Sequence, residues 1–600
     1  MSRRFDPVIL EIFWGRLIAI MEEAATTLVR TAFSGVIRDS HDYACALFDM
    51  RGDLIAQSPT STTGLISCIV NTVKECSKKY PPEGLRDGDV LLWNDPYLIS
   101  GQTIDLTLVE PIFFKGRVVA YALNIAHHMD MGITKMGTTE SVDIFGEGLR
   151  IPLCKVQEEG KLREDIVDFI RVNVRVPDMV IGDLRAQFAS NRIVSTRIKE
   201  LLEELKWDDL QELANEIIGL TEASMRQLIR QIPDGIYRAE RKLDSVEGER
   251  VKISLKFIVK GDEITVDCDG TSPQVKSGVN VAINFTRSYL VYPLKCLINP
   301  EVFNNAGILK PFRLKVPEGS ILHLKWPAAG YGRTAIAHFL PEICFQALAA
   351  VFPEKVIASC GGTPLWVQTF IGKKKRRDQS MAHCFFHGGM GASSWKDGTS
   401  CLSFPPSLAN LPVELLENDM PIVVEKKELL CDSGGPGKFR GGLGQEITYY
   451  VPDKNLAPEG GELTVGVRGG RFKSPFLGIL GGKEAPPSAI ILNGRNVETG
   501  KGFTMKAGDR LVVRVSGGGG YGNPMERDHG AVVEDVRNGL ISRRAAQGEY
   551  FVVLKRNSVE VDLKATEQLR KRRREDLKKG GGKKQGPRPT STKPGRRMGL

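Results

Sequence analysis

Helical and strand-like hydrophobic patterns follow each other along this chain in long blocks, and this order limits the fold more than any single motif does. Apolar residues recur at helical spacing in residues 7–31 and through most of 160–230. Residues 236–275 alternate apolar and polar side chains as strands do, and glycine becomes dense between 384 and 525. Blocks of this kind are typical of α+β folds, whereas a doubly wound sheet needs a steady βα alternation. We therefore predict an α+β fold whose C-terminal half is β-rich and glycine-dense.

The pattern also predicts individual elements in the first half of the chain. Residues 43–58 (YACALFDMRGDLIAQS) indicate two strands that join at a turn over 50–53. Residues 107–128 indicate a second pair of strands with a turn at 115–116. Proline ends a helix at the residue before it, so we expect the long helical block to break near Pro177.

The chain has 600 residues, which is too many for one hydrophobic core. We predict an N-terminal α+β domain with a candidate metal site, a central mixed domain, a β-rich glycine-dense domain, a helical C-terminal segment and a basic disordered tail. The expected bounds of these five parts are 1–235, 236–425, 426–525, 526–558 and 559–600.

The net charge of +10 comes from the C-terminal end of the chain. Residues 570–600 contain 13 Lys and Arg against Glu575 and Asp576, so the rest of the chain is nearly neutral. A nearly neutral body argues against a surface that binds nucleic acid. Binding of RNA, anionic lipid or an acidic partner is therefore expected only at the tail. A solvated disordered tail without any partner explains the same composition.

The cysteines and the hydropathy of the chain indicate its compartment. There are 11 cysteines, none in a CxxC pair, which argues against a disulfide scaffold and against a structural zinc finger. No run of about 18 apolar residues is free of charges, and the N-terminal sequence lacks a small-residue cleavage site. We therefore expect a cytoplasmic protein with neither a membrane span nor a signal peptide.

The segment NIAHHMDMG (124–132) places His127, His128 and Asp130 at the end of an apolar strand-like run. Neighbouring side chains on a strand point to opposite faces, so we expect only one of the two histidines to bind a given ion. Asp105 begins the preceding strand-like stretch and can lie beside His127 at the ends of adjacent strands. Carboxylate and imidazole together suit Zn, Mn, Fe or Co. Two structural histidines with a turn aspartate are the alternative interpretation.

Glycine-rich segments and a Cys–His pair are weaker candidates. SGGGGYGNP (516–524) lets backbone N–H groups approach an anion, but it lacks the GK[ST] ending of a phosphate loop. A tight turn with close packing is the other interpretation of this segment. Cys384 next to His383 matches a nucleophile pair, with a buried thiol as the alternative. The chain has no Walker A sequence, so we expect any ATP to be bound by another chain.

Eight segments together resemble the hydantoinase B / 5-oxoprolinase / acetone carboxylase family. Each segment alone is a weak signal, whereas their number and their order along roughly 5–555 make the resemblance specific. The segments are RDSHDYACALFDMRGDLIAQ, WNDPYLISGQTIDLTLVEPIF, IAHHMDMG, EGLRIPLCKV, DGTSPQV, GGMGASSWKDGTS, DSGGPGKFRGGLG and GGGGYGNPMERD.

The resemblance implies a multidomain, hydantoinase B-like fold and a place in a hetero-oligomer. A partner subunit of the hydantoinase A type, with an actin-like ATPase fold, would use ATP to phosphorylate an amide or carbonyl oxygen. The present chain would complete the reaction at a divalent metal (Zn, Mn or Fe), which polarises an oxygen or lowers the pKa of a bound water. Members of the lactamase type then cut a ring C–N bond with water, and carboxylase members join an enolate-like carbon to CO2.

The resemblance also assigns metal ligands. The family pattern His-x-x-Asp, followed about 22 residues later by His, places ligands at Asp105 and His127 and puts the first His at Gln102. Glutamine is a weaker, neutral donor, so this departure implies a different metal, a weakened site or a subunit that no longer catalyses. Asp42 matches an acidic family position that completes the site.

We expect a subunit of an ATP-dependent hydrolase that opens a cyclic amide such as hydantoin, 5-oxoproline or a lactam. His128 and Asp130 are the candidate catalytic residues, because either can hold a water or orient the ligand imidazole. The alternatives are a subunit of an ATP-dependent acetone/acetophenone-type carboxylase and a divergent non-catalytic subunit of such a complex. A protein that binds nucleic acid or an anionic surface through its tail is a further alternative.

Overall fold

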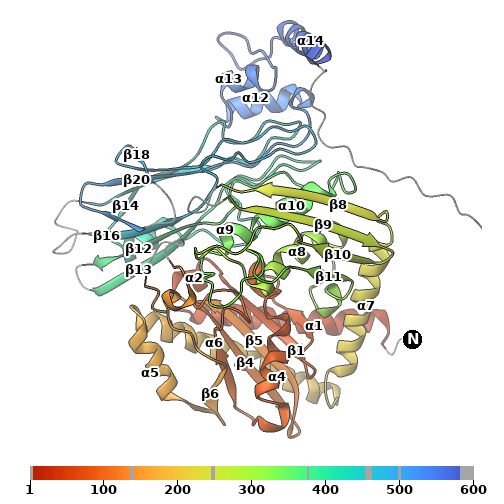
Figure 1. Ribbon diagram of the computed structural model, residues 1–600, viewed down its shortest axis with the longest axis vertical. Coiled ribbons are helices and arrows are strands. Elements are labelled where there is room, and N and C mark those ends of the chain that lie inside the picture. Colours follow the sequence, from red (N-terminus) through yellow and green to blue (C-terminus); the bar gives the residue numbers. More distant parts are fainter. Residues whose placement is uncertain are drawn as a thin grey trace, which may run out of the picture.

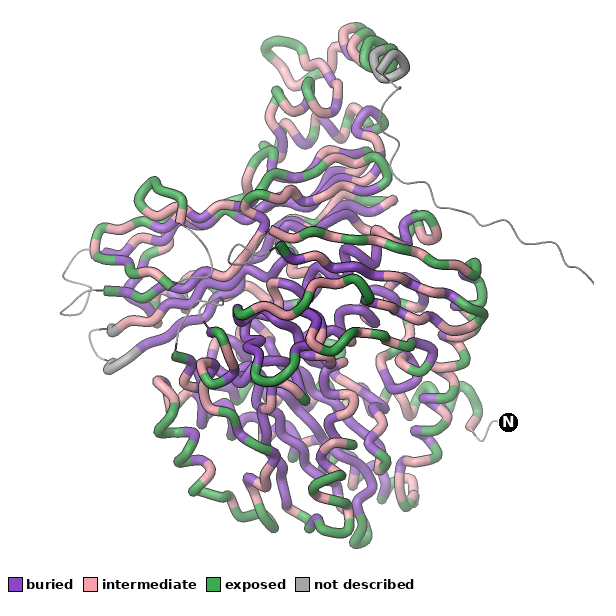
Figure 2. Tube along the Cα trace, in the orientation of Figure 1, coloured by how far each residue is buried: buried purple, intermediate pink, exposed green. Residues whose placement is uncertain are grey.

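The computed structural model describes residues 5–134, 141–244, 250–374, 377–452, 462–497 and 502–580. In these residues, four β-sheets form the framework and helices pack around them (Figure 1). Buried residues concentrate in the sheets and in the helix faces that cover them, whereas the outer loops are largely exposed (Figure 2). The predicted α+β fold is confirmed.

A seven-stranded antiparallel sheet organises the N-terminal part, in the order β2-β1-β5-β4-β3-β6-β7. Both predicted strand pairs are confirmed, since β1 pairs with β2 and β4 pairs with β5. The strands are β1 (Tyr43–Asp49), β2 (Leu54–Gln57), β3 (Val90–Trp93), β4 (Asp105–Phe114), β5 (Arg117–His127), β6 (Cys154–Glu158) and β7 (Lys161–Leu162).

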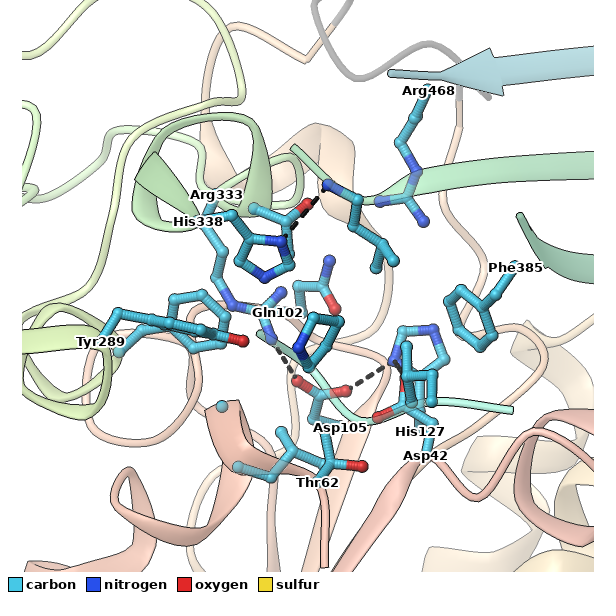
Figure 3. Close-up of a pocket in the computed structure, with 17 residues that line it drawn as sticks. Asp42, Thr62, Gln102, Asp105, His127, Tyr289, Arg333, His338, Phe385 and Arg468 are labelled. Atoms are coloured by element: carbon cyan, nitrogen blue, oxygen red, sulfur yellow. Dashed lines mark hydrogen bonds and ion pairs between the residues drawn. The ribbon is translucent and has the colours of Figure 1, made fainter. Parts of the chain in front are cut away.

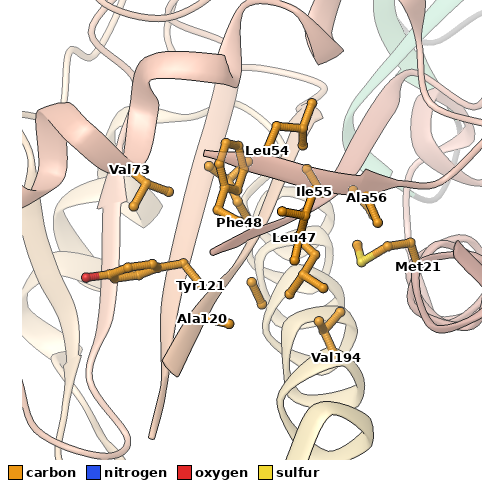
Figure 4. Packing of buried hydrophobic residues seen from close by; sticks show 14 of the residues in the cluster. Met21, Leu47, Phe48, Leu54, Ile55, Ala56, Val73, Ala120, Tyr121 and Val194 are labelled. Atoms are coloured by element: carbon orange, nitrogen blue, oxygen red, sulfur yellow. The ribbon is translucent and has the colours of Figure 1, made fainter. Parts of the chain in front are cut away.

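Two long helices, α1 (Pro7–Thr31) and α6 (Pro177–Leu205), pack on this sheet and on each other. Figure 4 shows Met21 of α1 and Val194 of α6 beside Leu47 of the sheet, and all three side chains are fully or almost fully buried. Burying a side chain of this size stabilises the fold by about 1.5–3 kcal/mol. Smaller helices complete this part, namely α2 (Gly35–Arg38), α3 (Thr63–Ile66), α4 (Thr72–Lys79), α5 (Glu164–Asn173) and α7 (Gln211–Ile229).

A second sheet has the order β11-β10-β9-β8, and β10 and β11 run parallel. Its strands are β8 (Gly235–Lys242), β9 (Lys252–Lys260), β10 (Glu263–Asp267) and β11 (Phe312–Lys315). Helices α8 and α10 pack against each other, and α10 also covers β8 and β9. The helices of this part are α8 (Ile283–Ile298), α9 (Thr334–Ala337) and α10 (Phe339–Leu348).

Two further sheets share one core of buried aliphatic and aromatic side chains. Their orders are β13-β12-β16-β19 and β14-β15-β20-β17-β18. The domain division stays a prediction, although β12 pairs with β16 across the boundary expected at residue 425. The elements are β12 (Trp366–Lys374), β13 (Arg377–Phe386), α11 (Val413–Asp419), β14 (Val423–Leu429), β15 (Gln445–Tyr450), β16 (Leu463–Arg468), β17 (Ala489–Leu492), β18 (Arg495–Asn496), β19 (Gly502–Met505) and β20 (Arg510–Val515).

The glycine-dense segments of this region pack backbone against backbone. A Cβ at Gly441 would overlap the carbonyl oxygen of Gly518, and a Cβ at Gly361 would overlap that of Ser516. Glycine is the residue that allows two backbones to approach this closely. The close packing that the sequence offered as an interpretation of residues 516–524 is therefore confirmed.

The C-terminal part is helical. Helices α12 (His529–Arg537) and α13 (Arg543–Gly548) lie where the sequence predicts a helical segment. Helix α14 (Leu563–Gly580) lies within the tail that the sequence predicts to be disordered, and its many Lys, Arg, Glu and Leu residues favour a helix. Residues 581–600 lie outside the described residues. None of the helices in the described ranges is both long enough and apolar enough to cross a membrane.

Candidate functional site

Asp105 and His127 lie opposite each other at the ends of two antiparallel strands. Asp105 is the first residue of β4 and His127 the last of β5, and the register pairs them directly. Directly opposed residues of an antiparallel pair have neighbouring side chains. The His127 Nδ1 atom is 2.9 Å from Asp105 Oδ1, and the Asp105 side chain is fully buried. The sequence-based expectation that these two residues meet is confirmed.

Asp42 joins this pair because its backbone lies beside the end of β5. The His127 N–H donates to the Asp42 carbonyl at 3.0 Å, and the Asp42 Oδ2 atom is 3.7 Å from His127 Nδ1. Gln102 also lies here, and its side-chain amide donates to the backbone carbonyl of Tyr331. The structure therefore brings together all four residues predicted as metal ligands.

These four residues line a buried cavity of about 40 Å³ (Figure 3). A space of this volume has room for about three waters. The other lining residues come from several parts of the chain far apart in sequence. They are Thr62, Gly64, Leu65, Phe285, Tyr289, Arg333, Thr334, His338, Leu365, Phe385, Pro406, Leu408 and Arg468.

Arg333 is the residue of this site that sequence reasoning missed most clearly. Its Nη2 atom is 2.9 Å from Asp105 Oδ2, and its guanidinium lies 4.1 Å from the centre of the Phe285 ring. The Arg333 residue is only 3% exposed, and its Nε and Nη1 atoms have no hydrogen-bond partner. It is the residue just before α9, more than 200 positions from Asp105, so local sequence patterns do not link the two.

The two carboxylates of the pocket differ in electrostatics. Burial alone would raise the pKa of Asp105, but the Arg333 guanidinium and the His127 hydrogen bond outweigh it and lower that pKa below its ordinary value. Burial raises the pKa of Asp42, and the positive charge of a protonated His127 only partly opposes this effect. Asp105 is therefore the carboxylate that stays ionised, and Asp42 is the one that takes up a proton more readily.

His383 lies beside His127 and contacts Arg468, which itself lines the cavity. The His383 ring lies 5.5 Å from the His127 ring, between centroids. An arginine side chain can only donate, so His383 Nε2 accepts from Arg468 Nη2 at 3.2 Å. His383 Nδ1 then carries the proton and donates to Thr369 Oγ1 at 2.9 Å. Burial lowers the pKa of His383 well below its ordinary value, which agrees with a neutral ring.

Cys384 is a buried thiol, the alternative that the sequence offered to a nucleophile pair. Burial raises the pKa of Cys384 to about 12. The thiolate is the reactive form of cysteine, and a pKa this high leaves almost none of it at neutral pH.

The two predicted catalytic residues, His128 and Asp130, do not line the cavity. His128 Nε2 lies 2.9 Å from the Gln187 side-chain oxygen on α6, in keeping with the opposite direction expected for neighbouring side chains on a strand. Asp130 accepts from the Arg175 side chain at 2.7 Å and from the Gly132 N–H at 3.0 Å. Both residues fix the segment that follows β5.

The donor set fits a divalent metal poorly as it is arranged. Asp105 already accepts from His127 through one oxygen, and from Arg333 and Ser100 through the other. A divalent ion on Asp105 would lie next to the guanidinium and would be repelled by it. Among the described residues, no group of three or more His, Cys, Asp and Glu side chains has an arrangement that would hold a metal ion. The metal inferred from the resemblance stays a prediction.

Comparison with known proteins places this site in a family. The Hydantoinase B/oxoprolinase family profile matches residues 6–524. A protein of Pseudomonas sp. (strain NS671), described as a subunit of a D-/L-hydantoinase, is 28% identical over 95% of this chain and 98% of its own length. The beta subunit of the Pseudomonas jessenii caprolactamase is 29% identical, over 94% of this chain and 98% of its own length.

Solved structures agree with these sequence matches. The crystal structure of the ATP-dependent caprolactamase from Pseudomonas jessenii superposes with a TM-score of 0.87 at 27% identity and covers 95% of this chain and 100% of its own. A nucleotide-free acetone carboxylase structure has a TM-score of 0.84 at 20% identity, over 96% of this chain and 84% of its own, and shares the fold. This chain belongs to the hydantoinase B/oxoprolinase family.

Proposed function

We propose that this chain is the hydantoinase B-type component of an ATP-dependent hydrolase, which opens a cyclic amide together with an ATPase subunit of the hydantoinase A type. The observation that carries this proposal is the buried Asp105–His127 pair, in a chain that matches the beta subunit of caprolactamase along almost its whole length. A carboxylate–imidazole pair in an enclosed pocket suits the activation of water.

The division of labour between the two subunits follows from the family resemblance. The partner binds ATP and phosphorylates the amide oxygen of the substrate, in keeping with the lack of a Walker A sequence in this chain. Phosphorylation turns a poorly reactive amide into one that water can attack. The present chain then supplies the Asp105–His127 pair that activates the attacking water.

His127 takes the proton in this step. The ionised Asp105 can only accept a hydrogen bond, so His127 Nδ1 carries the hydrogen between them and Nε2 keeps its lone pair. The water oxygen forms a bond to the ring carbon while its proton moves to Nε2. The C–N bond then breaks, the nitrogen leaves with that proton, and the carbonyl carbon is left as an acyl phosphate. A second water cleaves the acyl phosphate to the ring-opened acid and inorganic phosphate. The Arg333 charge stabilises the negative charge of the phosphorylated oxygen.

The comparisons favour hydrolysis over carboxylation. The relatives described as a hydantoinase subunit and a caprolactamase subunit are 28% and 29% identical to this chain. The likeness to acetone carboxylase, at 20% identity, supports a shared fold alone.

The test is a reconstituted assay. The chain is purified with a hydantoinase A-type partner and given ATP with hydantoin, 5-oxoproline or caprolactam, and both ADP and the ring-opened acid are measured. We expect one of these amides to be opened only when both subunits and ATP are present. His127→Ala should abolish ring opening, and His529→Ala, in the distant C-terminal helical part, should not.

The other outcomes are equally informative. ATP-dependent fixation of bicarbonate onto a ketone, with no ring opening, would replace the proposal by the carboxylase alternative. A stable complex with the partner that turns over neither class of substrate would identify a non-catalytic subunit.

A further inference from the structure

We propose that the guanidinium of Arg333 is the cation of this pocket, that it takes the place of a divalent metal, and that its free N–H groups bind an oxygen of the ligand. The first observation is its position. Arg333 Nη2 lies 2.9 Å from Asp105 Oδ2, on the carboxylate to which the family pattern assigns a metal. The contact is internal to the pocket, because Asp105 is fully buried and Arg333 is 3% exposed.

Asp105, the carboxylate that stays ionised, has a cationic partner without a metal ion. Asp42 and Asp105 are the carboxylates that line the cavity, and Arg333 and Arg468 are the guanidiniums. Buried charges are stable when each has a partner of opposite sign. A divalent ion would bring two more positive charges into a cavity that two guanidiniums already line. The built-in cation therefore disfavours the metal.

A second feature of the donor set also disfavours a metal ion. Gln102 stands where the family pattern has histidine, and its amide nitrogen is used in a hydrogen bond to the Tyr331 carbonyl. The loss of an imidazole ligand and the presence of a guanidinium on the central carboxylate both weaken a metal site. Gln102 and Arg333 are 231 residues apart in sequence and meet at one cavity.

Arg333 also has N–H groups that are free to donate hydrogen bonds to a ligand. Its Nε and Nη1 atoms are buried and make no hydrogen bond in the protein. Buried donors are nearly always paired, so two unpaired donors on a side chain that lines a cavity indicate a ligand with oxygen acceptors. Guanidinium groups bind carboxylate and phosphate oxygens well, because their N–H groups form a planar fork. Phe285 lies against the face of the guanidinium at 4.1 Å and holds its orientation.

The decisive experiment measures metal content and needs no activity. The chain is incubated with Zn, Mn or Fe(II), desalted and analysed for bound metal. We expect wild type and Gln102→His to retain none, because Arg333 still occupies the carboxylate. The double variant Gln102→His/Arg333→Met should retain about one ion per chain. The matched control is Gln102→His/Arg468→Met, which removes the guanidinium that does not touch Asp105 and should retain none.

One ion per chain in wild type, lost in His127→Ala, would overturn the proposal. That result does not depend on any Arg333 variant folding. A double variant that is folded by circular dichroism and still binds no metal would also contradict it.

The ligand half of the proposal rests on the proposed function and has its own test. Inorganic phosphate serves as the probe, and the melting temperature of the chain is followed as phosphate is added. We expect a saturable increase for wild type and none for Asp105→Asn/Arg333→Met, in which both members of the ion pair are removed. The absence of any increase in wild type overturns this half alone, and neither readout uses the ring-opening assay.

Discussion

Asp105 interacts with His127 through one carboxylate oxygen and with Arg333 through the other, at 2.9 Å in both cases. One buried carboxylate therefore links the end of β5 to the loop before α9, which belong to different parts of the chain. This link sets both the position of the imidazole and the charge of the pocket.

Removing the Asp105 charge should destabilise the protein. Asp105→Asn leaves the buried Arg333 guanidinium without its partner, and breaking a buried pair in this way costs about 3–5 kcal/mol. Asp105→Asn/Arg333→Met should cost less than the sum of the two single variants, because neither charge is then left alone. Urea unfolding of the four proteins measures this coupling, and strictly additive values would show that the pair does not interact.

His127 and His128 should behave differently although they are neighbours. His127→Gln removes the proton acceptor of the pocket, and kcat for ring opening should fall by about 10²- to 10⁴-fold. His128→Gln disturbs the contact with Gln187 outside the cavity, so it should lower stability while changing kcat far less. Steady-state kinetics with the reconstituted complex and a thermal melt of each variant separate the two effects. An equal loss of kcat in both would restore the catalytic role predicted for His128.

The sequence is sufficient to predict the paired strands and the meeting of Asp105 with His127. The turn at 115–116 brings the two strand ends together, which is enough to expect Asp105 near His127. The exact register needs the structure, because an irregularity between Ile112 and Phe113 shifts the pairing by one residue and so places Asp105 opposite His127. The sequence does not predict Arg333, because no periodic pattern relates a loop residue to a strand more than 200 positions away. The sequence does not predict helix α14 for a different reason. A charge-rich composition favours both a disordered segment and an exposed helix, so composition alone does not distinguish them.

Glu147 should make stability depend on pH. Burial raises the pKa of Glu147 to about 8, and one of its oxygens accepts the Tyr331 N–H at 2.7 Å, which holds the loop that leads to Arg333. The folded state binds this proton more tightly than the unfolded state, whose glutamate has a pKa of about 4.3. The stabilisation is therefore complete below about pH 4.3 and is lost as pH rises through about 8.

Glu147→Gln removes this dependence. The unfolding free energy of wild type should fall relative to the variant by at most about 1.4 kcal/mol per pH unit between pH 5 and 8. Urea unfolding at several pH values measures the difference between the two proteins. Parallel curves over this range would show that Glu147 does not titrate there.

The core under the seven-stranded sheet should be sensitive to truncation. Leu47 is fully buried where Met21 and Val194 meet the sheet, so Leu47→Ala removes apolar contacts and leaves a cavity. The expected loss is about 2–5 kcal/mol of unfolding free energy. Leu563→Ala is the matched control, because Leu563 is 62% exposed and its truncation should change stability by less than about 0.5 kcal/mol. Similar losses in urea for both variants would contradict this placement of the core.

Two glycines of the same chain should respond in opposite directions to alanine. A Cβ at Gly441 would overlap the backbone carbonyl of Gly518. The Gly441 and Gly518 backbones cannot move apart without disturbing the connections between strands. Gly441→Ala should therefore destabilise the protein by well over 1 kcal/mol or prevent folding. Gly219 lies in α7 with nothing within 4 Å of such a Cβ, so Gly219→Ala should stabilise by about 0.5–1 kcal/mol, since alanine favours a helix interior. Melting temperatures and soluble yields of the two variants test this directly. A Gly441→Ala protein as stable as wild type would mean that the glycine segments are not packed backbone to backbone, and the density of glycine between residues 384 and 525 would need another cause.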